Sequence, residues 1–142
     1  MSETALVLNI EGDPTELSPN AIRRMCVGKR IRLTRAWQAR ARQAWENAGR
    51  PTFTERVQIR FTICRPRRLD ADNAAGSVKA LLDGLTRKGG RLPEGMVWDD
   101  SERYVEIVSV TQMTGKLWKG REKVVVGVSP CVSRNENPDD VY

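Results

Sequence analysis

The sequence predicts an α+β fold in which two main helices pack on one small mixed β-sheet. Apolar and polar residues alternate through RVQIRFTI at 56–63, which is the period of a half-buried strand. Apolar residues recur at helical spacing in two longer segments, and Gly and Pro residues separate these segments from the strands. A chain of 142 residues is long enough for one domain, which we expect at 1–130, before a polar tail at 131–142.

The predicted elements follow one another in the order β, α, β, α, β, β. Strands are expected at 5–10, 56–63, 104–112 and 123–128, and helices at about 34–48 and 73–87. The segment 11–33 is rich in turn-forming and basic residues and is predicted to be a long loop. In the first helix, Trp37 and Trp45 fall on one apolar face, which places them in the core rather than on a nucleobase-stacking surface. VWDD at 97–100 is expected to be a brief extended piece.

The residue composition excludes several kinds of chemistry. The chain has no histidine, which excludes a Ser-His or Cys-His nucleophile pair, a histidine base and a histidine metal ligand. Its three cysteines are isolated, so neither a zinc cage nor a disulfide framework is expected. No apolar run approaches the roughly 20 residues of a membrane span, and the first residues lack a secretory signal pattern. We therefore expect a cytoplasmic protein without a membrane partner, and any hydrolytic chemistry must use carboxylates, lysines and a bound metal.

Charge is unevenly distributed along the chain, whose formal net charge is +6. Residues 1–69 contain 14 Lys and Arg against 6 Asp and Glu, whereas residues 70–142 contain 10 against 12. A basic first half before an acidic cluster indicates a surface that attracts a polyanion around a site that could hold cations. A solvated, arginine-rich surface without a nucleic-acid partner explains the same counts about equally well.

Acidic residues gather in RLDADNAAGSVKALLDGL at 68–85 and again in WDD at 98–100. Asp70 and Asp72 are two residues apart and point to the same side in extended backbone. Lys79 and Asp83 follow Asp72 at seven and eleven positions, so a continuous helix places all three on one face. An ordinary structural explanation is that Asp72 or Asn73 caps the helix and that Lys79 pairs with Asp83.

That structural explanation does not account for the whole pattern. Asp70 has no capping role if Asp72 or Asn73 is the cap, and three arginines directly precede it. Several carboxylates brought together repel one another unless a cation lies between them, and Mg²⁺ prefers such hard oxygen ligands. A bound metal polarises a phosphodiester and activates a water nucleophile, while neighbouring arginines and a lysine position the phosphate. The residues alone thus favour a metal-dependent phosphodiesterase that acts on nucleic acid.

The same residues resemble a known family. The pattern D-x-D-N, then K-x-x-x-D-x-L within a helix, then D-D after a loop, is similar to that of the RusA family of Holliday-junction resolvases, common in phages and prophages. Here it is DADN at 70–73, KALLDGL at 79–85 and DD at 99–100, and the resemblance covers mainly 56–110. SPN at 18–20 also resembles the family's N-terminal segment.

The resemblance implies a small α+β homodimer that binds four-way DNA junctions and nicks two opposing strands symmetrically with Mg²⁺, or Mn²⁺ in its place. Two symmetric cuts require two sites, which is the reason for the dimer. The family's metal-binding acids correspond to Asp70, Asp72 and Asp100. Asp83 and Asp99 are additional acids of the same pattern.

The chain departs from the family pattern at its lysine. The family's lysine lies three residues after the DN asparagine, and this chain has Gly76 there. We expect Lys79, one helical turn further on, to supply the catalytic phosphate contact instead. A glycine inside a helix is unfavourable, so Gly76 indicates the close approach of backbone or ligand.

The leading hypothesis is an Mg²⁺-dependent endodeoxyribonuclease that resolves four-way junctions in DNA recombination and repair. Its expected DNA-binding residues are Arg23, Arg24, Lys29, Arg30, Arg32, Arg65, Arg67 and Arg68. Two alternatives stay open. One is a non-catalytic branched-DNA-binding protein whose acids are caps and ion-pair partners, and the other is a nuclease for flaps and other branched DNA.

Overall fold

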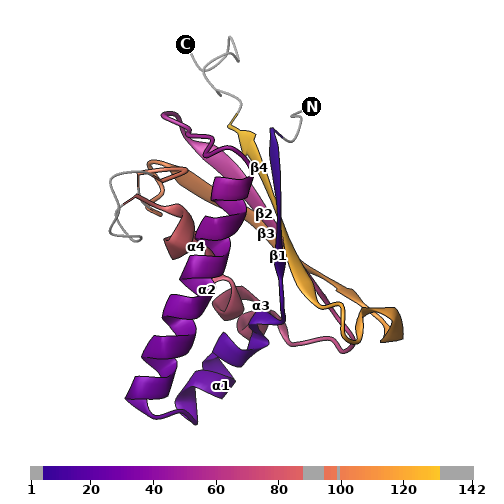
Figure 1. The fold of residues 1–142 in the computed structure, drawn as a ribbon. Helices are drawn as coiled ribbons and strands as arrows, with labels where there is room; N and C mark the ends of the chain where they lie inside the picture. Colours follow the sequence, from indigo (N-terminus) through magenta and orange to yellow (C-terminus); the bar gives the residue numbers. More distant parts are fainter. Residues whose placement is uncertain (1–4, 88–94, 99, 132–142) are drawn as a thin grey trace, which may run out of the picture.

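A computed structural model describes residues 5–87, 95–98 and 100–131, and it confirms the predicted α+β class (Figure 1). The described strands are β1 (Leu6–Glu11), β2 (Val57–Arg65), β3 (Val105–Thr114) and β4 (Lys123–Pro130). The described helices are α1 (Pro19–Arg23), α2 (Val27–Asn47), α3 (Ala71–Ser77) and α4 (Lys79–Leu85), with short 3₁₀ turns η1 (Pro14–Leu17) and η2 (Lys116–Trp118). The predicted polar tail, apart from residue 131, lies outside the described residues.

The described strands form one mixed sheet in the order β1-β4-β2-β3. β4 pairs antiparallel with both β1 and β2, whereas β2 and β3 are parallel. Val57 at the start of β2 lies opposite Val105, and Arg65 at its end lies opposite Thr114. A parallel pair needs a long crossover connection, and α3 and α4 lie within the one that joins β2 to β3.

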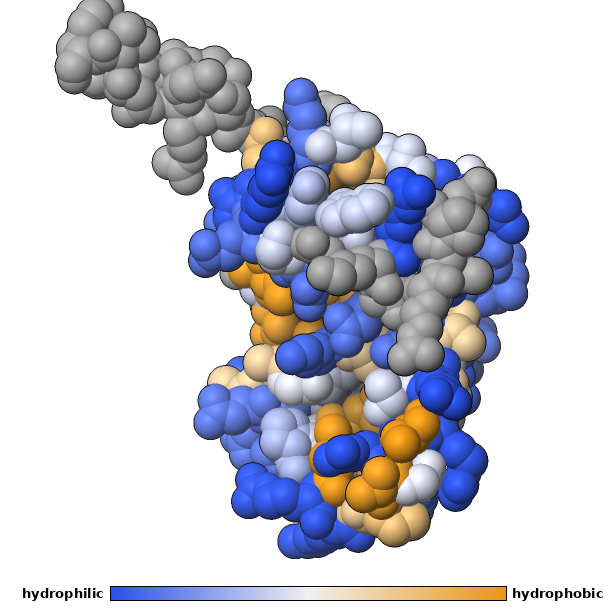
Figure 2. All heavy atoms as spheres, turned by 90° about the vertical axis from the view of Figure 1, so that its left-hand side faces the viewer, coloured by the Kyte–Doolittle hydropathy of each residue, from blue (hydrophilic) through white to orange (hydrophobic). Residues whose placement is uncertain are grey.

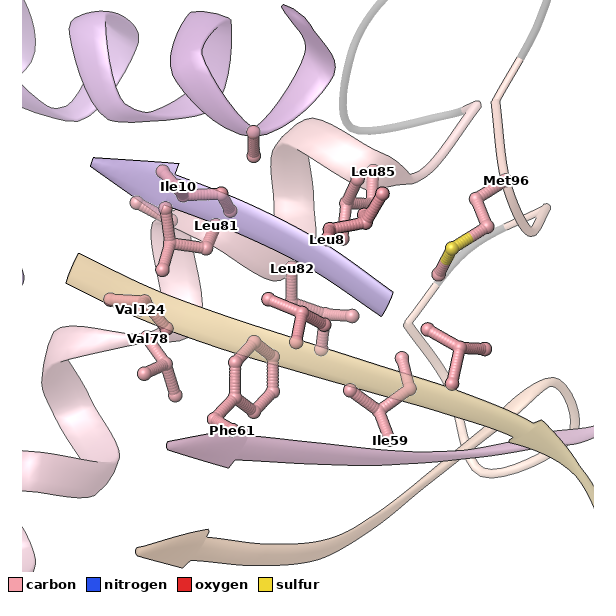
Figure 3. Packing of buried hydrophobic residues seen from close by; sticks show 14 of the residues in the cluster. Leu8, Ile10, Ile59, Phe61, Val78, Leu81, Leu82, Leu85, Met96 and Val124 are labelled. Carbon is pink, nitrogen blue, oxygen red and sulfur yellow. The ribbon is translucent and has the colours of Figure 1, made fainter. Parts of the chain in front are cut away.

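The helices lie together on one side of the sheet (Figure 1). The alternating positions of β1, β2 and β4 face α4 and bury their apolar side chains against it. Figure 3 shows the side chains that fill this space: Leu8, Ile10, Ile59, Phe61, Val78, Leu81, Leu82, Leu85, Met96 and Val124. Trp37 and Trp45 of α2 are each 1% exposed, which confirms their predicted place in the core.

The prediction of a loop at 11–33 is wrong, because α2 begins at Val27 rather than Thr34. From residue 29 to 48 the chain has no Gly or Pro, and its Lys, Arg, Leu, Ala and Gln residues have high helix propensity. A search for an apolar stripe does not find the first turns of α2, because the side chains there are mostly exposed. The early turns of α2 and the short α1 therefore extend away from the sheet (Figure 1).

The single helix predicted at 73–87 is two helices, α3 and α4, which meet at Val78. Gly76, Ser77 and Val78 are all weak helix formers. In addition, the Ser77 hydroxyl donates to the Asn73 carbonyl at 2.6 Å and so competes with the helical hydrogen bonds there. Asp72 therefore lies in α3, whereas Lys79 and Asp83 lie one turn apart in α4, and the predicted continuous face of all three does not form.

Among the described residues, no helix is both long and apolar enough to cross a membrane.

Candidate active site

Asp70 is the N-cap of α3, and this overturns the prediction that Asp72 or Asn73 caps the helix. One Asp70 carboxylate oxygen accepts a hydrogen bond from the Asn73 backbone N–H at 2.9 Å. The Asn73 side-chain amide donates to both carboxylate oxygens, at 3.0 and 2.9 Å. The cap lies earlier than predicted because Asp70 has extended backbone and Ala71 is already helical, so Asp72 falls in the first turn.

These hydrogen bonds hold Asp70 as an anion. The pKa of Asp70 is lowered, mainly by the Asn73 backbone N–H, then by the Asn73 side chain and by the Asp72 backbone N–H. Both Asp70 and Asp72 are exposed to solvent, and Asp72 lies where the positive end of the helix dipole favours a carboxylate.

Asn73 connects Asp70 to the N-terminal segment. Its side-chain oxygen accepts a hydrogen bond from the Asn20 backbone N–H at 3.1 Å, and Asn73 itself is 7% exposed. The Asn20 side chain in turn accepts from Arg23 at 3.0 Å. Asp70, Asn73, Asn20 and Arg23 thus form one hydrogen-bonded chain from α3 to α1.

The sequence predicts the close approach of backbone or ligand at Gly76, and the group that approaches is instead a side chain of this protein. A Cβ atom added at Gly76 would lie 2.6 Å from two ring carbons of Pro19. Pro19 and Asn20 belong to the SPN segment that begins α1, where the Ser18 hydroxyl accepts from the Ala21 N–H at 3.2 Å. Gly76 therefore allows α1 to pack against α3 at the point where a lysine would be placed by the family pattern.

A second pair of carboxyl groups is formed by Asp83 of α4 and Asp100, which precedes β3. The side chains of Asp83 and Asp100 lie close enough to interact, although 17 positions separate them in the sequence. The pKa of the half-buried Asp83 is raised, first by burial and then by the charge of Asp100, while Lys79 opposes the shift. Lys79 is exposed one turn before Asp83, so one positive and two acidic groups share this part of the surface.

Close packing of α4 on α2 fixes the position of Asp83. Gly84 is buried, and a Cβ added there would overlap the backbone of Gln38 in α2. Two helices whose backbones approach so closely have little freedom to slide. On the other side, Asp100 precedes the turn in which Ser101 accepts hydrogen bonds from the Tyr104 and Val105 N–H groups, both at 2.9 Å.

The structure does not bring Asp70 next to Asp100. The backbone of Leu69 exchanges two 2.8 Å hydrogen bonds with the Gln112 side chain, which places Asp70 near the later half of β3. Asp100 lies at the beginning of β3, beside Val105. The seven steps along β3 from Val105 to Gln112 span about 23 Å of strand.

Within the described residues, no three Asp, Glu or Cys side chains are grouped so as to hold a metal ion. Asp99 lies outside the described residues, so its predicted role stays a prediction, as do the predicted roles of Asp70 and Asp72 as metal ligands.

Five of the predicted DNA-binding residues gather at the end of the molecule formed by α1 and the first turns of α2. We call this the basic tip, and it consists of Arg23, Arg24, Lys29, Arg30 and Arg32, all exposed. Val27 is 62% and Ile31 42% exposed in these first turns of α2. Figure 2 shows a small apolar patch among hydrophilic side chains at the lower end of the molecule. α2 has no side-chain cap and no acid in its first turn, so the helix dipole adds to the positive potential.

The remaining three predicted DNA-binding residues differ from one another. Arg65 forms an ion pair with Asp13 at 3.2 Å and also donates to the backbone carbonyl of Arg67. Its side chain is 16% exposed, so it is largely used within the protein. Arg67 and Arg68 are exposed between β2 and α3.

Sequence reasoning missed two residues beside the carboxyl pair. Trp98 is 48% exposed, and the Arg87 guanidinium lies over its ring at 4.8 Å from the centroid. The signal that could have been used is the tryptophan two residues before Asp100.

No protein-family model matches the chain, and no curated protein matches it either.

Proposed function

We propose that this protein is a divalent-metal-dependent endodeoxyribonuclease that cuts branched DNA, with the four-way junction as the substrate that the RusA resemblance implies. The observation that carries the proposal is that Asp83 and Asp100 lie close enough to interact, with Lys79 one turn before Asp83. Two carboxyl groups at this separation must share a proton or neutralise their charge with a cation. Burial is the first cause of the raised pKa of Asp83, and the charge of Asp100 adds to it.

The donor set of this pair fits Mg²⁺. This ion takes oxygen ligands and is usually bound by one or two carboxylates, together with waters and substrate phosphates. Asp83 and Asp100 would hold the ion, and when bound it would polarise the phosphodiester and lower the pKa of a water nucleophile. The exposed ammonium group of Lys79 would donate to a phosphate oxygen and offset the negative charge that develops there.

The basic tip supports DNA as the partner. Lys29 and Arg30 lie in the first turns of α2, where cations are disfavoured by the helix dipole, and no described acid of that first turn compensates them. An anion bound there would remove this cost, and helix N-termini bind phosphate for the same reason. Paired symmetric nicks would require a homodimer, which brings two such tips to one junction. We place this activity in DNA recombination and repair in the cytoplasm.

The first experiment tests metal-dependent cleavage. Labelled four-way junction, flap and linear duplex are incubated with the protein in Mg²⁺ or EDTA. We expect cleavage of the junction in Mg²⁺ alone, and its loss in Asp100→Asn but not in Glu102→Gln, a matched exposed acid two residues further on. Cleavage that persists in EDTA, or that Asp83→Asn and Asp100→Asn both leave unchanged, would contradict the proposed mechanism. The Asp72→Asn variant tests the ligand that the resemblance alone implies.

The second experiment tests the basic tip by salt titration of junction binding in EDTA. Each phosphate contact contributes about one unit to the slope of log K against log salt. Lys29→Ala with Arg30→Ala should therefore reduce that slope by about two. The control is Arg50→Ala at the other end of α2, where Arg50 forms an ion pair with Glu46 at 2.9 Å. An equal slope in the tip variant and in wild type would remove the tip from the proposal.

A non-catalytic branched-DNA-binding protein is the second candidate. It is favoured by the use of Asp70 as a helix cap and of Asp13 as the partner of Arg65. In this case the junction is bound with the same salt dependence, but no strand is cut in Mg²⁺ or Mn²⁺. Cutting of flaps in preference to junctions would keep the enzyme and change its substrate.

A further inference from the structure

The segment that carries Trp98 is fastened on two sides by backbone hydrogen bonds. The Met96 N–H donates to the Leu85 carbonyl at 2.8 Å, and the Arg87 N–H donates to the Val97 carbonyl at 2.9 Å. On its other side, the Phe53 N–H donates to the Met96 carbonyl at 2.8 Å. Met96 and Val97 are buried, so the backbone directly before Trp98 is held in place.

A hollow of about 480 Å³ opens beside this segment. Its walls include the rings of Phe53, Trp98 and Tyr104, the guanidinium of Arg87 and the hydroxyl-bearing residue Thr52. Its size falls in the range of small-molecule sites, which are mostly apolar with a few polar groups. Thr54 and Tyr104 also carry hydroxyl groups, and this combination of aromatic residues, one arginine and several hydroxyls is suited to a planar, polar, uncharged ring system.

Trp98 differs from the two core tryptophans. Trp37 and Trp45 are each 1% exposed, whereas nearly half of Trp98 remains in contact with solvent. The Arg87 guanidinium lies over the Trp98 ring, 4.8 Å from its centroid, and is a second flat group beside it. Aromatic rings and guanidinium planes are the groups on which unpaired nucleobases stack.

The hollow lies next to the carboxyl pair. Trp98 is two residues before Asp100, so their Cα atoms are at most about 7 Å apart. A nucleotide whose phosphate reached Asp83 and Asp100 would thus have its base within reach of Trp98. We propose that the hollow binds one unpaired nucleobase of branched DNA by stacking on Trp98 and Arg87. This inference rests on the proposed function. Because linear duplex offers no unpaired base, binding of that base would make the protein prefer branched DNA.

Tryptophan fluorescence tests the inference directly, because stacking with a nucleobase quenches the indole. Wild type, Trp98→Phe and Trp98→Ala are titrated with a four-way junction and with a single-stranded oligonucleotide in EDTA, where no strand is cut. We expect quenching in wild type that is absent in Trp98→Phe. Trp98→Ala should bind both ligands about tenfold more weakly, and Trp98→Phe, which keeps a ring, within about threefold of wild type.

The matched control is Trp118→Ala, because Trp118 is the other tryptophan that is not fully buried and a lysine lies over its ring at 5.8 Å. It should leave both the quenching and the affinity unchanged. Equal quenching in wild type and Trp98→Phe, with equal affinity in Trp98→Ala, overturns the base site. If that occurs in a protein that still cuts junctions, the proposed function stands alone. If junctions are not cut but the oligonucleotide still quenches Trp98, the base site stands and the nuclease fails.

Discussion

Two acidic regions of this protein are alike in sequence and opposite in physical state. At the start of α3, Asp70 accepts hydrogen bonds from the backbone and side chain of Asn73, and its pKa is lowered. On α4, Asp83 is half-buried against Asp100, and its pKa is raised. The first carboxylate accepts hydrogen bonds from the protein, while the second is partly desolvated beside a like charge, an effect that Lys79 only opposes.

This difference separates an acid whose charge is stabilised by the start of a helix from one whose charge is disfavoured by burial. A carboxylate whose oxygens already accept several hydrogen bonds gains less from a metal ion than one that is desolvated beside a like charge. Asp70 belongs to the hydrogen-bonded chain that ends at Arg23, so it positions α1 and one side of the basic tip. Asp83 and Asp100 have no comparable positioning role.

The largest expected effect separates the two regions by activity. Asp83→Asn should lower junction cleavage at least about 100-fold, since a metal ion contributes several kcal/mol to such a reaction. Asp70→Asn should retain most of the activity, because Asn caps a helix about as well as Asp. Single-turnover cleavage of a labelled junction measures both variants. An equal loss in Asp70→Asn, with unchanged thermal stability, would restore Asp70 as a metal ligand.

The packing that positions Asp83 gives the next effect. Gly84→Ala should lower the free energy of unfolding by about 3 kcal/mol, because its methyl group would force α4 away from the Gln38 backbone. Gly28→Ala is the matched control, since an added Cβ there meets only the end of Arg32 at 3.7 Å. That change should stabilise by about 0.5–1 kcal/mol through helix propensity. Urea denaturation followed by circular dichroism measures both, and equal values would show that the helix contact is loose.

The bridge between α1 and α3 gives a smaller effect. Asn73→Ala removes the side chain that accepts from the Asn20 backbone N–H and donates to Asp70. This loss should cost about 1–3 kcal/mol of stability. Gln43→Ala removes an exposed amide hydrogen bond to Asn47 and should cost less than about 0.5 kcal/mol. Chemical denaturation compares the two. A cost for Asn73→Ala no greater than for Gln43→Ala would mean that the bridge does not hold α1 in place.

The smallest effects are in the pH dependence, and they have opposite signs. The raised pKa of Asp83 means that the folded protein holds this proton more tightly than the unfolded chain. Its contribution to stability is therefore lost as the pH rises from about 4 through the folded pKa, and Asp83→Asn should flatten that decline. The lowered pKa of Asp70 gives a contribution that is present above about 4 and lost as the pH falls through the folded pKa.

Thermal denaturation in metal-free buffer between pH 3 and 8 measures both contributions. At neutral pH, Asp83→Asn should melt above wild type and Asp70→Asn below it. Added Mg²⁺ should raise the melting temperature of wild type but not of Asp83→Asn, because only the ionised pair binds the ion. Shifts of the same sign in both variants would remove the contrast between the two regions.

Much of the fold was predictable because it depends on local periodicity. The alternation in β2 and the apolar faces of the helices give the sheet, the core tryptophans and the α+β class. The start of α2 was missed because helix propensity alone, without an apolar face, extends the helix back to Val27. The break at Val78 was missed because three weak helix formers act together there.

The sequence by itself determined the periodic elements, the basic first half, the absence of histidine and the set of candidate acids, because these are properties of composition and spacing. Which of these acids lie near one another depends instead on the tertiary structure. Asp83 and Asp100 meet because backbone hydrogen bonds hold the segment around Met96 against the end of α4. Asp70 stays apart from Asp100 because β2 and β3 are parallel. The chain leaves β2 near the end of β3, where Leu69 bonds to Gln112, and Asp100 lies before the start of β3. Such distances depend on long-range packing, which no local pattern in the sequence records.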